Sequence, residues 1–140
     1  MKEHKLKIGL DLDGTINATK QSIKFFSLIT NAIKETSHIY IITYREKEDL
    51  KNTKKELKEL GIFYHEIIFV NSYLEKNAFV FKNKLDVFID DVDESFYALK
   101  EDDCFVMKPR SYGNYDFPKE YGKTGKWIYS ERTGKKLDEL

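Results

Sequence analysis

The stretch "LKIGLDLDGT", residues 6–15, places an apolar run directly before two aspartates, Asp11 and Asp13. The run has the length and composition of a buried strand. Two carboxylates one residue apart repel each other and lose solvation if they are buried, so a stable fold gains nothing from them alone. The stretch is therefore either an exposed turn after a strand or a site where a cation holds two carboxylates together.

Strand-like and helix-like segments alternate along the chain from this stretch onward. Short apolar, β-branched or aromatic runs predict strands over 6–12, 38–43, 65–70, 85–90 and 104–107. Apolar spacing and stop signals predict helices over about 20–36, 46–60, 73–83 and 93–101. This alternation predicts an α/β fold with a mainly parallel, five-stranded sheet.

The length of 140 residues suits a single domain, residues 1–140, with a core over about 6–107. Residues 108–140 contain both prolines and several glycines and tyrosines, which predicts a loop-rich C-terminal extension. We expect one short element in it, around Trp127–Tyr129.

The balance of positive and negative residues limits the classes of partner that we expect. Lys plus Arg and Asp plus Glu both number 24, so bulk electrostatic binding to nucleic acid or to a membrane is not expected. The single cysteine, Cys104, excludes an intrachain disulfide, and we expect it to pack in a buried strand. The N-terminus has no apolar signal region and no run has the length of a membrane span, so we expect a cytoplasmic protein.

Polar residues stand at the ends of three predicted strands. The first strand ends with Asp11 and Asp13, the second with Thr43, and the fourth with Asp90 and Asp91. Ligands of open parallel sheets bind outside the carboxyl ends of the strands, so these side chains should converge. Each pair of carboxylates would then cost roughly a few kcal/mol. A hard divalent cation removes that cost, and Mg²⁺ suits a few carboxylates combined with water and phosphate.

Such a site favours phosphoryl chemistry, because a carboxylate can attack a phosphorus that it helps to align. The phosphate oxygens also need donors and positive charge, which the hydroxyl and backbone N–H of Thr43 and a lysine would supply. The candidate lysines are Lys76, Lys82 and Lys84. We favour Lys76, because it would lie near the start of a helix at the ligand-facing edge.

Three of these segments together resemble a known family. The motifs "DLDGT" (11–15), "IITYR" (41–45) and "FIDD" (88–91) are similar to motifs one, two and four of the haloacid dehalogenase superfamily, in order, spacing and placement at strand ends. The resemblance implies a three-layer, Rossmann-like phosphomonoester hydrolase that uses Mg²⁺ and an aspartyl-phosphate intermediate. The intervals between the motifs leave no room for a substantial cap domain. An open site of this type implies large substrates or a homo-oligomer in which a partner subunit covers it.

Carried over by position, the resemblance assigns a role to each motif residue. Asp11 would be the nucleophile, and Asp13 the general acid/base, with its backbone carbonyl on the metal. Thr43 would bind the phosphate, and Lys76 would screen the charges of nucleophile and phosphate. The implied metal ligands are Asp11, Asp13, Asp90 and Asp91, of which Asp90 or Asp91 would be the direct acidic ligand from the fourth strand.

A looser resemblance points to small 5'(3')-deoxyribonucleotidase-like proteins. It rests on "TYR" after the second strand, on "FIDD", and on the later segment "SYGNYDF" (111–117). It implies a phosphorylated substrate such as a nucleotide, contacted beyond its phosphate by Tyr44 and Arg45, and also by Tyr112 and Asn114.

Two other classes compete with a hydrolase. A phosphoacceptor receiver domain also uses acidic residues, a threonine and a lysine around Mg²⁺, but its phosphorylated aspartate lies at a later strand. Here the third strand ends in "FVNS" (69–72), without an aspartate. A catalytically inactive binding protein with the same fold could lose Asp11 or Asp13 freely, and both are present. The sequence therefore favours a phosphatase.

Overall fold

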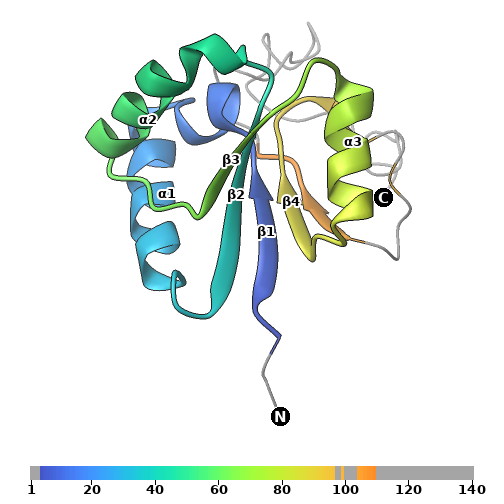
Figure 1. The fold of residues 1–140 in the computed structure, drawn as a ribbon. Helices are drawn as coiled ribbons and strands as arrows, with labels where there is room; N and C mark the ends of the chain where they lie inside the picture. The colour runs from blue at the N-terminus through green and yellow to red at the C-terminus, as the bar shows by residue number, and fades with distance from the viewer. Residues whose placement is uncertain (1–3, 97–98, 100–103, 110–140) are drawn as a thin grey trace, which may run out of the picture.

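Strands and helices alternate as the sequence predicts (Figure 1). The computed structural model describes residues 4–96, 99 and 104–109. The strands are β1 (Leu6–Leu10), β2 (Ser37–Thr43), β3 (Glu66–Phe69), β4 (Val87–Ile89) and β5 (Phe105–Met107). The helices are α1 (Lys20–Ala32), α2 (Leu50–Glu59) and α3 (Tyr73–Lys82), with single turns over Leu12–Ile16, Lys47–Asp49 and Asp93–Phe96.

All five strands pair in parallel, in the order β3-β2-β1-β4-β5, which confirms the predicted sheet. In the central strand, Leu10 lies opposite Ile41 of β2 and Ile89 of β4. The chain moves from β1 to β2 and β3 on one side and then crosses to β4 on the other. The switch point of the sheet therefore lies between the carboxyl ends of β1 and β4, where ligands of such folds bind.

The helices cover both faces of the sheet and give three layers (Figure 1). On one face, side chains such as Ile8 and Ile41 form a buried cluster with Phe26 of α1 and Leu57 of α2. On the other face, Ile42 and Phe88 pack with Val80 of α3, in a cluster that also contains Cys104. Successive strand residues point to opposite faces, so one strand supplies both cores. Cys104 is buried as predicted, but it lies directly before β5 rather than in a buried strand, and the three residues of β5 are exposed.

Local hydrogen bonds explain where the helices begin and end. Thr19 and Ser22 form a reciprocal capping box at the start of α1, and Ser72 caps α3 by accepting from the N–H of Glu75 at 3.0 Å. After α2, Gly61 has a φ of +73°, as expected for the predicted stop signal. The helix predicted to reach residue 36 ends at Ala32, because the next residues form a turn that leads into β2.

Other boundaries differ from the predictions by a few residues. The helix predicted from residue 46 begins with a 3₁₀ turn over Lys47–Asp49 before α2, as is common at helix starts. The helix predicted over 93–101 is a 3₁₀ turn, Asp93–Phe96, in the described part. The predicted extension 108–140 lies beyond the described residues from position 110 onward, and with it Tyr112, Asn114 and Trp127–Tyr129.

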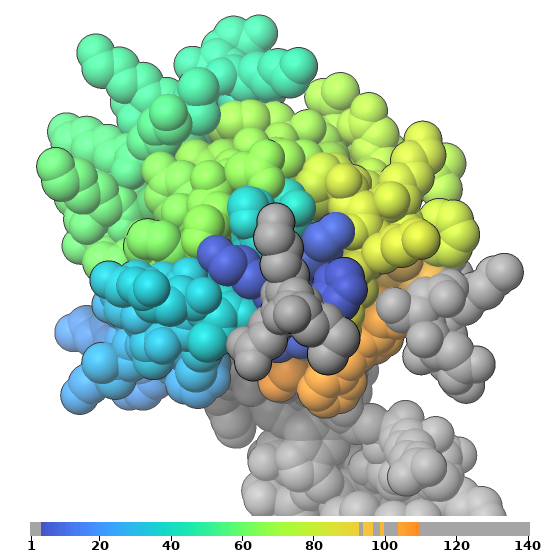
Figure 2. Space-filling view, turned by 60° about the horizontal axis from the view of Figure 1, so that its bottom comes forward, coloured from blue at the N-terminus to red at the C-terminus, as the bar shows by residue number. Residues whose placement is uncertain are grey.

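The carboxyl edge of the sheet carries no inserted domain in the described part of the chain. Between β1 and β2 lie only the Leu12–Ile16 turn and α1, and between β2 and α3 only a 3₁₀ turn, α2 and β3. The opposite edge, where the strands begin, faces the viewer in Figure 2, with the first described residues near the centre. None of the helices in the described residues has both the length and the apolar character needed to cross a membrane.

Candidate active site

Three aspartates gather at the switch point of the sheet. Asp11 directly follows β1, while Asp90 and Asp91 directly follow β4. One carboxylate oxygen from each residue lies within 4.8 Å of the other two. Asp11 is 5% exposed and Asp90 is fully buried, whereas Asp91 is half-buried. The convergence expected from the strand ends thus brings together three of the four predicted aspartates.

Lys76 reaches this cluster from α3 and joins two of its members. Its ammonium nitrogen lies 3.0 Å from Oδ1 of Asp11 and 2.7 Å from Oδ2 of Asp90. The side chain is 2% exposed, so the lysine is enclosed with its partners. Of the three candidate lysines, Lys76 is the one at the carboxylates, because Lys82 and Lys84 lie at the other end of α3.

The turn after β1 is built around the aspartates. The Thr15 hydroxyl lies 3.0 Å from Oδ2 of Asp11 and 3.3 Å from Oδ1 of Asp91, within hydrogen-bond reach of both. Gly14 has a φ of +81°, and a Cβ atom there would lie 2.5 Å from Oδ2 of Asp91. The backbone angle strains any other residue, and a Cβ atom would push the Asp91 carboxylate away, so the glycine allows Asp91 to approach the turn.

The electrostatics of the cluster show a shortage of positive charge. Burial raises the pKa of the Asp11 carboxyl, the charge of Asp90 raises it further, and Lys76 offsets only part of this. Burial acts to lower the pKa of Lys76, but the two carboxylates outweigh it and raise that pKa, so the ammonium stays charged. Three carboxylates face one ammonium, and a second cation would balance them.

The donor set suits a hard divalent cation. One carboxylate oxygen each from Asp11, Asp90 and Asp91 lies within 4.8 Å of the other two, so the three residues could hold a metal ion together. All three donors are carboxylate oxygens, as a hard cation prefers.

Asp13 does not bring its carboxylate into this cluster. It is held by Arg45, whose Nε lies 2.9 Å from Oδ2 and whose Nη2 lies 2.7 Å from Oδ1. Glu56 of α2 anchors the same guanidinium at 2.6 Å, and the Asn17 amide donates to Asp13 at 3.1 Å. The carboxylate of Asp13 therefore does not join Asp11, Asp90 and Asp91, and the ligand role assigned to its backbone carbonyl stays a prediction.

This network also sets the charge of Asp13. Hydrogen bonds from Arg45 lower the pKa of the carboxyl against the opposing effect of burial, and Asn17 adds to the lowering. Arg45, which the resemblance places against substrate, is thus engaged with two carboxylates in this structure. No sequence pattern pointed to Asn17 or Glu56, because Glu56 looks like any other charged residue of α2.

Thr43 is the last residue of β2, the strand next to β1, and Tyr44 follows it. Thr43 is fully buried, and its hydroxyl oxygen lies 3.4 Å from the backbone nitrogen of Arg45. Tyr44 is 55% exposed, and its ring centroid lies 5.5 Å from that of Tyr73, at the start of α3. Tyr73 was not predicted as a residue of the site, although its position three residues before Lys76 places the two side chains on one face of α3.

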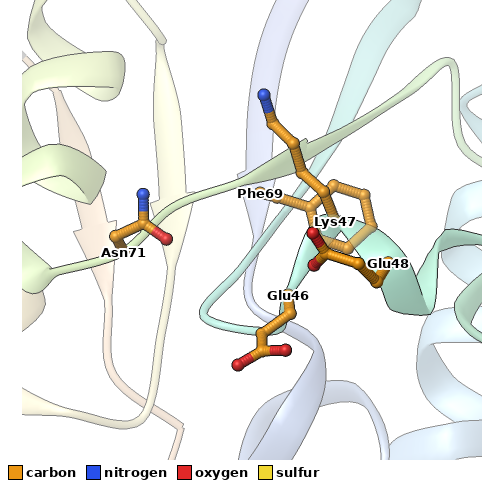
Figure 3. Close-up of a pocket in the computed structure, with 5 residues that line it drawn as sticks. All are labelled: Glu46, Lys47, Glu48, Phe69 and Asn71. Atoms are coloured by element: carbon orange, nitrogen blue, oxygen red, sulfur yellow. The ribbon is translucent and has the colours of Figure 1, made fainter.

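A pocket of about 400 Å³ lies between the segment that follows β2 and the end of β3 (Figure 3). It is formed by the loop after β2 and by the end of β3. Its lining residues are Glu46, Lys47, Glu48, Phe69 and Asn71.

Comparisons with known proteins give information about the fold only. No family model matches the chain, and a search of curated proteins finds no match. A crystal structure of an uncharacterized protein from Corynebacterium glutamicum is similar, with a TM-score of 0.57 and 10% sequence identity over 79% of this chain and 88% of that one. A likeness at this identity supports the three-layer, Rossmann-like α/β architecture.

Proposed function

We propose that this protein is a Mg²⁺-dependent phosphomonoester hydrolase of the haloacid dehalogenase type, acting through an aspartyl-phosphate on Asp11. One observation carries the proposal: a buried lysine, Lys76, joins Asp11 to Asp90 at the switch point of the sheet, beside Asp91. Structural pairing alone would need one carboxylate for one ammonium. The excess of carboxylates is what a site for a cation and a phosphate requires.

In the first step, a carboxylate oxygen of Asp11 attacks the phosphorus and the ester P–O bond breaks. The leaving oxygen takes a proton from Asp13, and the phosphoryl group stays on Asp11. Lys76 lowers the cost of ionising the nucleophile in part and offsets phosphate charge, while Thr43 offers a hydroxyl to a phosphate oxygen. Asp11, Asp90 and Asp91 would hold Mg²⁺, which would neutralise charge on the phosphoryl oxygens.

In the second step, a water molecule attacks the same phosphorus and gives its proton to Asp13. The bond between phosphorus and Asp11 breaks, and inorganic phosphate leaves. The ionised form of Asp13, which Arg45 favours, suits this second step directly. The first step needs the protonated form, so Asp13 has to gain a proton before the leaving group departs.

A receiver-type phosphoacceptor domain is less well supported. The residues after β3 are Val70, Asn71 and Ser72, none of which can accept a phosphoryl group as a carboxylate. The homo-oligomer implied by an open site stays a prediction, which light scattering of the purified protein would test.

The decisive experiment measures phosphate release from a panel of nucleotides, sugar phosphates and phosphorylated nucleic-acid ends, with Mg²⁺ or with EDTA. We expect turnover that requires Mg²⁺ and disappears in Asp11→Asn. Intact-mass analysis after acid quenching should show one phosphoryl group on the wild type and none on the variant. No turnover on any ester, or full activity in Asp11→Asn, would contradict the proposal.

A further inference from the structure

Helix α1 has a second apolar stripe in addition to the one that it buries. Phe26 and Thr30 are buried, and Phe26 packs in the core beneath the helix. Phe25, Leu28 and Ile29 lie outside this buried side and are 57%, 65% and 36% exposed. Spacings of three and four residues bring them together along the helix. A single exposed apolar residue needs no explanation, but a contiguous group of them marks an interaction surface.

The exposed stripe lies on the flank of α1 that faces away from α2. The side chains of Ser27 and Asn31 each donate to the carbonyl of Gly61, just after α2, at 3.0 Å. At 3.6 residues per turn, Phe25 and Ile29 lie on the opposite flank. Since α1 leads from β1 to β2 and α2 leads from β2 to β3, that flank is turned toward β4 and β5.

Strand β5 is exposed on the same side of the sheet. Val87 and Ile89 of β4 pack against the core cluster of α1 and α2. Phe105 lies opposite Val87 in the parallel pair of β4 and β5. Met107 lies opposite Ile89, so both side chains of β5 point to the side of α1. Phe105 is 66% exposed and Met107 is 42% exposed, so this part of the sheet is left largely open.

These residues form one surface, which we call the α1–β5 face. Two strand spacings, about 10 Å, separate β5 from β1. Segments pack beside a helix at a similar distance of about 8–10 Å, so a single segment can contact α1 and β5 at once. The face is defined by Phe25, Leu28, Ile29, Phe105 and Met107.

The chain itself supplies a candidate to cover this face. The C-terminal segment, residues 110–140, begins three residues after Met107. Segments that do not fold are poor in aromatic residues, so an aromatic-rich segment favours burial against an apolar surface. Attachment to β5 also gives the segment an effective concentration on the order of millimolar at the face, which favours it over a second copy. Its aromatic residues are Tyr112, Tyr115, Phe117, Tyr121, Trp127 and Tyr129.

We propose that residues 110–140 dock on the α1–β5 face, with the apolar run Trp127–Tyr129 as the anchor. This contact is independent of the proposed hydrolase activity. It also bears on the candidate site, because the backbone N–H of Asp90 donates to the carbonyl of Met107 at 3.2 Å. Docking of the segment would therefore hold β5 in place beside a residue of the aspartate cluster.

The test uses the fluorescence of Trp127, the single tryptophan of the chain. In the full-length wild type, light scattering should show a monomer. The emission of Trp127 should lie at shorter wavelength than in urea, and acrylamide should quench it less. Phe25→Glu and Phe105→Glu each place a charge on the face. Both should shift the emission toward that of the unfolded protein and remove most of the protection from acrylamide.

The matched control is Phe81→Glu on α3, which packs on the other side of the sheet. Phe81 is 54% exposed, close to the value for Phe25, and its replacement should leave the emission and the quenching of Trp127 unchanged. Circular dichroism spectra identical to the wild type confirm that each variant is folded. Leu28→Glu replaces either face variant that does not fold.

Three results would overturn the docking. The first is quenching of Trp127 in the native wild type as strong as in urea. The second is emission that stays unchanged in either face variant, or that shifts equally in Phe81→Glu. The third is a wild-type dimer that dissociates in both face variants, which would assign the α1–β5 face to a second copy of the chain.

Discussion

Arg45 holds the carboxylate of Asp13 through two parallel hydrogen bonds, of 2.9 Å from Nε and 2.7 Å from Nη2. This bidentate geometry is the strongest arrangement that an arginine and a carboxylate form. Glu56 fixes the other side of the guanidinium at 2.6 Å, so helix α2 positions Asp13 indirectly. Asp13 transfers protons in the proposed mechanism, so Arg45, which lies just after β2, fixes the position of the proton-transferring carboxylate.

Replacing Arg45 by glutamine should weaken turnover, because Asp13 loses the hydrogen bonds that position its carboxylate. Arg45 also lowers the pKa of Asp13, so its loss raises that pKa toward the ordinary range. Asp13 must be ionised to accept a proton from water, so the acid limb of the pH–rate profile should move to higher pH. At neutral pH Asp13 stays ionised in both proteins, and we expect kcat to fall there by about 10² through the lost positioning alone. Lys51→Gln, on the exposed face of α2, is the control, and a pH profile identical to the wild type in Arg45→Gln would refute the role.

Asp11→Asn should lower kcat by at least about 10³, as expected for loss of a nucleophile. In EDTA the same change should stabilise the protein, because it removes one of three crowded carboxylates.

The stability of the metal-free protein should also depend on pH through Asp11. Its pKa in the folded protein lies above the ordinary 3.8, so the folded state binds a proton more readily than the unfolded one. The contribution of Asp11 to the free energy of unfolding of the wild type should therefore increase as pH falls through the raised pKa. Urea unfolding in EDTA at pH 9 and pH 6 measures this gain relative to Asp11→Asn. A constant difference between the two proteins would rule out the buried, charge-crowded environment of Asp11.

Lys76→Met should destabilise the protein by about 3–5 kcal/mol, because two buried carboxylates lose their common partner. Mg²⁺ should recover part of this loss by supplying the missing charge, so the stabilisation by Mg²⁺ should be larger in the variant than in the wild type. Urea unfolding with Mg²⁺ and with EDTA measures both effects. The control, Lys82→Met, lies on the exposed side of the same helix, and its effect should stay within about 0.5 kcal/mol. Equal Mg²⁺ effects in Lys76→Met and wild type would count against a shared charge site.

The parts of the site that lie at strand ends were predictable from the sequence. Parallel strands must end at one edge, so Asp11, Asp90 and Thr43 could be brought together from the order of the segments alone. Lys76 followed from the same rule, because α3 returns from that edge. What could not be predicted depends on tertiary packing: whether Asp13 faces the cluster or Arg45 depends on how α2 places Glu56 against the end of β2.

The contact between the rings of Tyr44 and Tyr73 also depends on tertiary packing and could not be predicted. Tyr44 and Tyr73 are far apart in sequence, and only the pairing of β2 with β3 brings their segments together. The sequence pattern predicted β2 and β3 as strands but did not predict which residues of the two strands pair. No contact between these rings could therefore be derived.

Mg²⁺ should raise the stability of the wild type in proportion to its occupancy, by about 2.7 kcal/mol at 100 times the Kd. Asp90→Asn and Asp91→Asn should each reduce this gain, because each removes an oxygen from the cluster. Thermal unfolding at increasing Mg²⁺ gives the apparent affinity, with Glu59→Gln at the exposed end of α2 as the control. A gain from Mg²⁺ that persists in the double variant of Asp90 and Asp91 would place the cation elsewhere.

A histidine at the opposite edge should make stability fall in mild acid. Nδ1 of His65 accepts a hydrogen bond from the backbone N–H of Ile39 at 2.9 Å, and the ring stacks on His38 at 4.6 Å. Burial lowers the pKa of His65, and the charge of His38 lowers it further.

The folded state therefore resists protonation of His65 more than the unfolded state does. The stability that the neutral ring supplies is complete above the ordinary pKa of 6.5 and is lost as pH falls from there through the lowered value. Asp11 acts in the opposite direction over part of this range, so the wild type alone would not reveal the effect. His65→Asn keeps a side-chain acceptor for the Ile39 N–H but does not titrate. Urea unfolding at pH 7.5 and pH 5 measures the free energy of unfolding of both proteins. From pH 7.5 to pH 5, the wild type should lose stability relative to His65→Asn. Parallel pH curves for the two proteins would show that His65 is not protonated on unfolding.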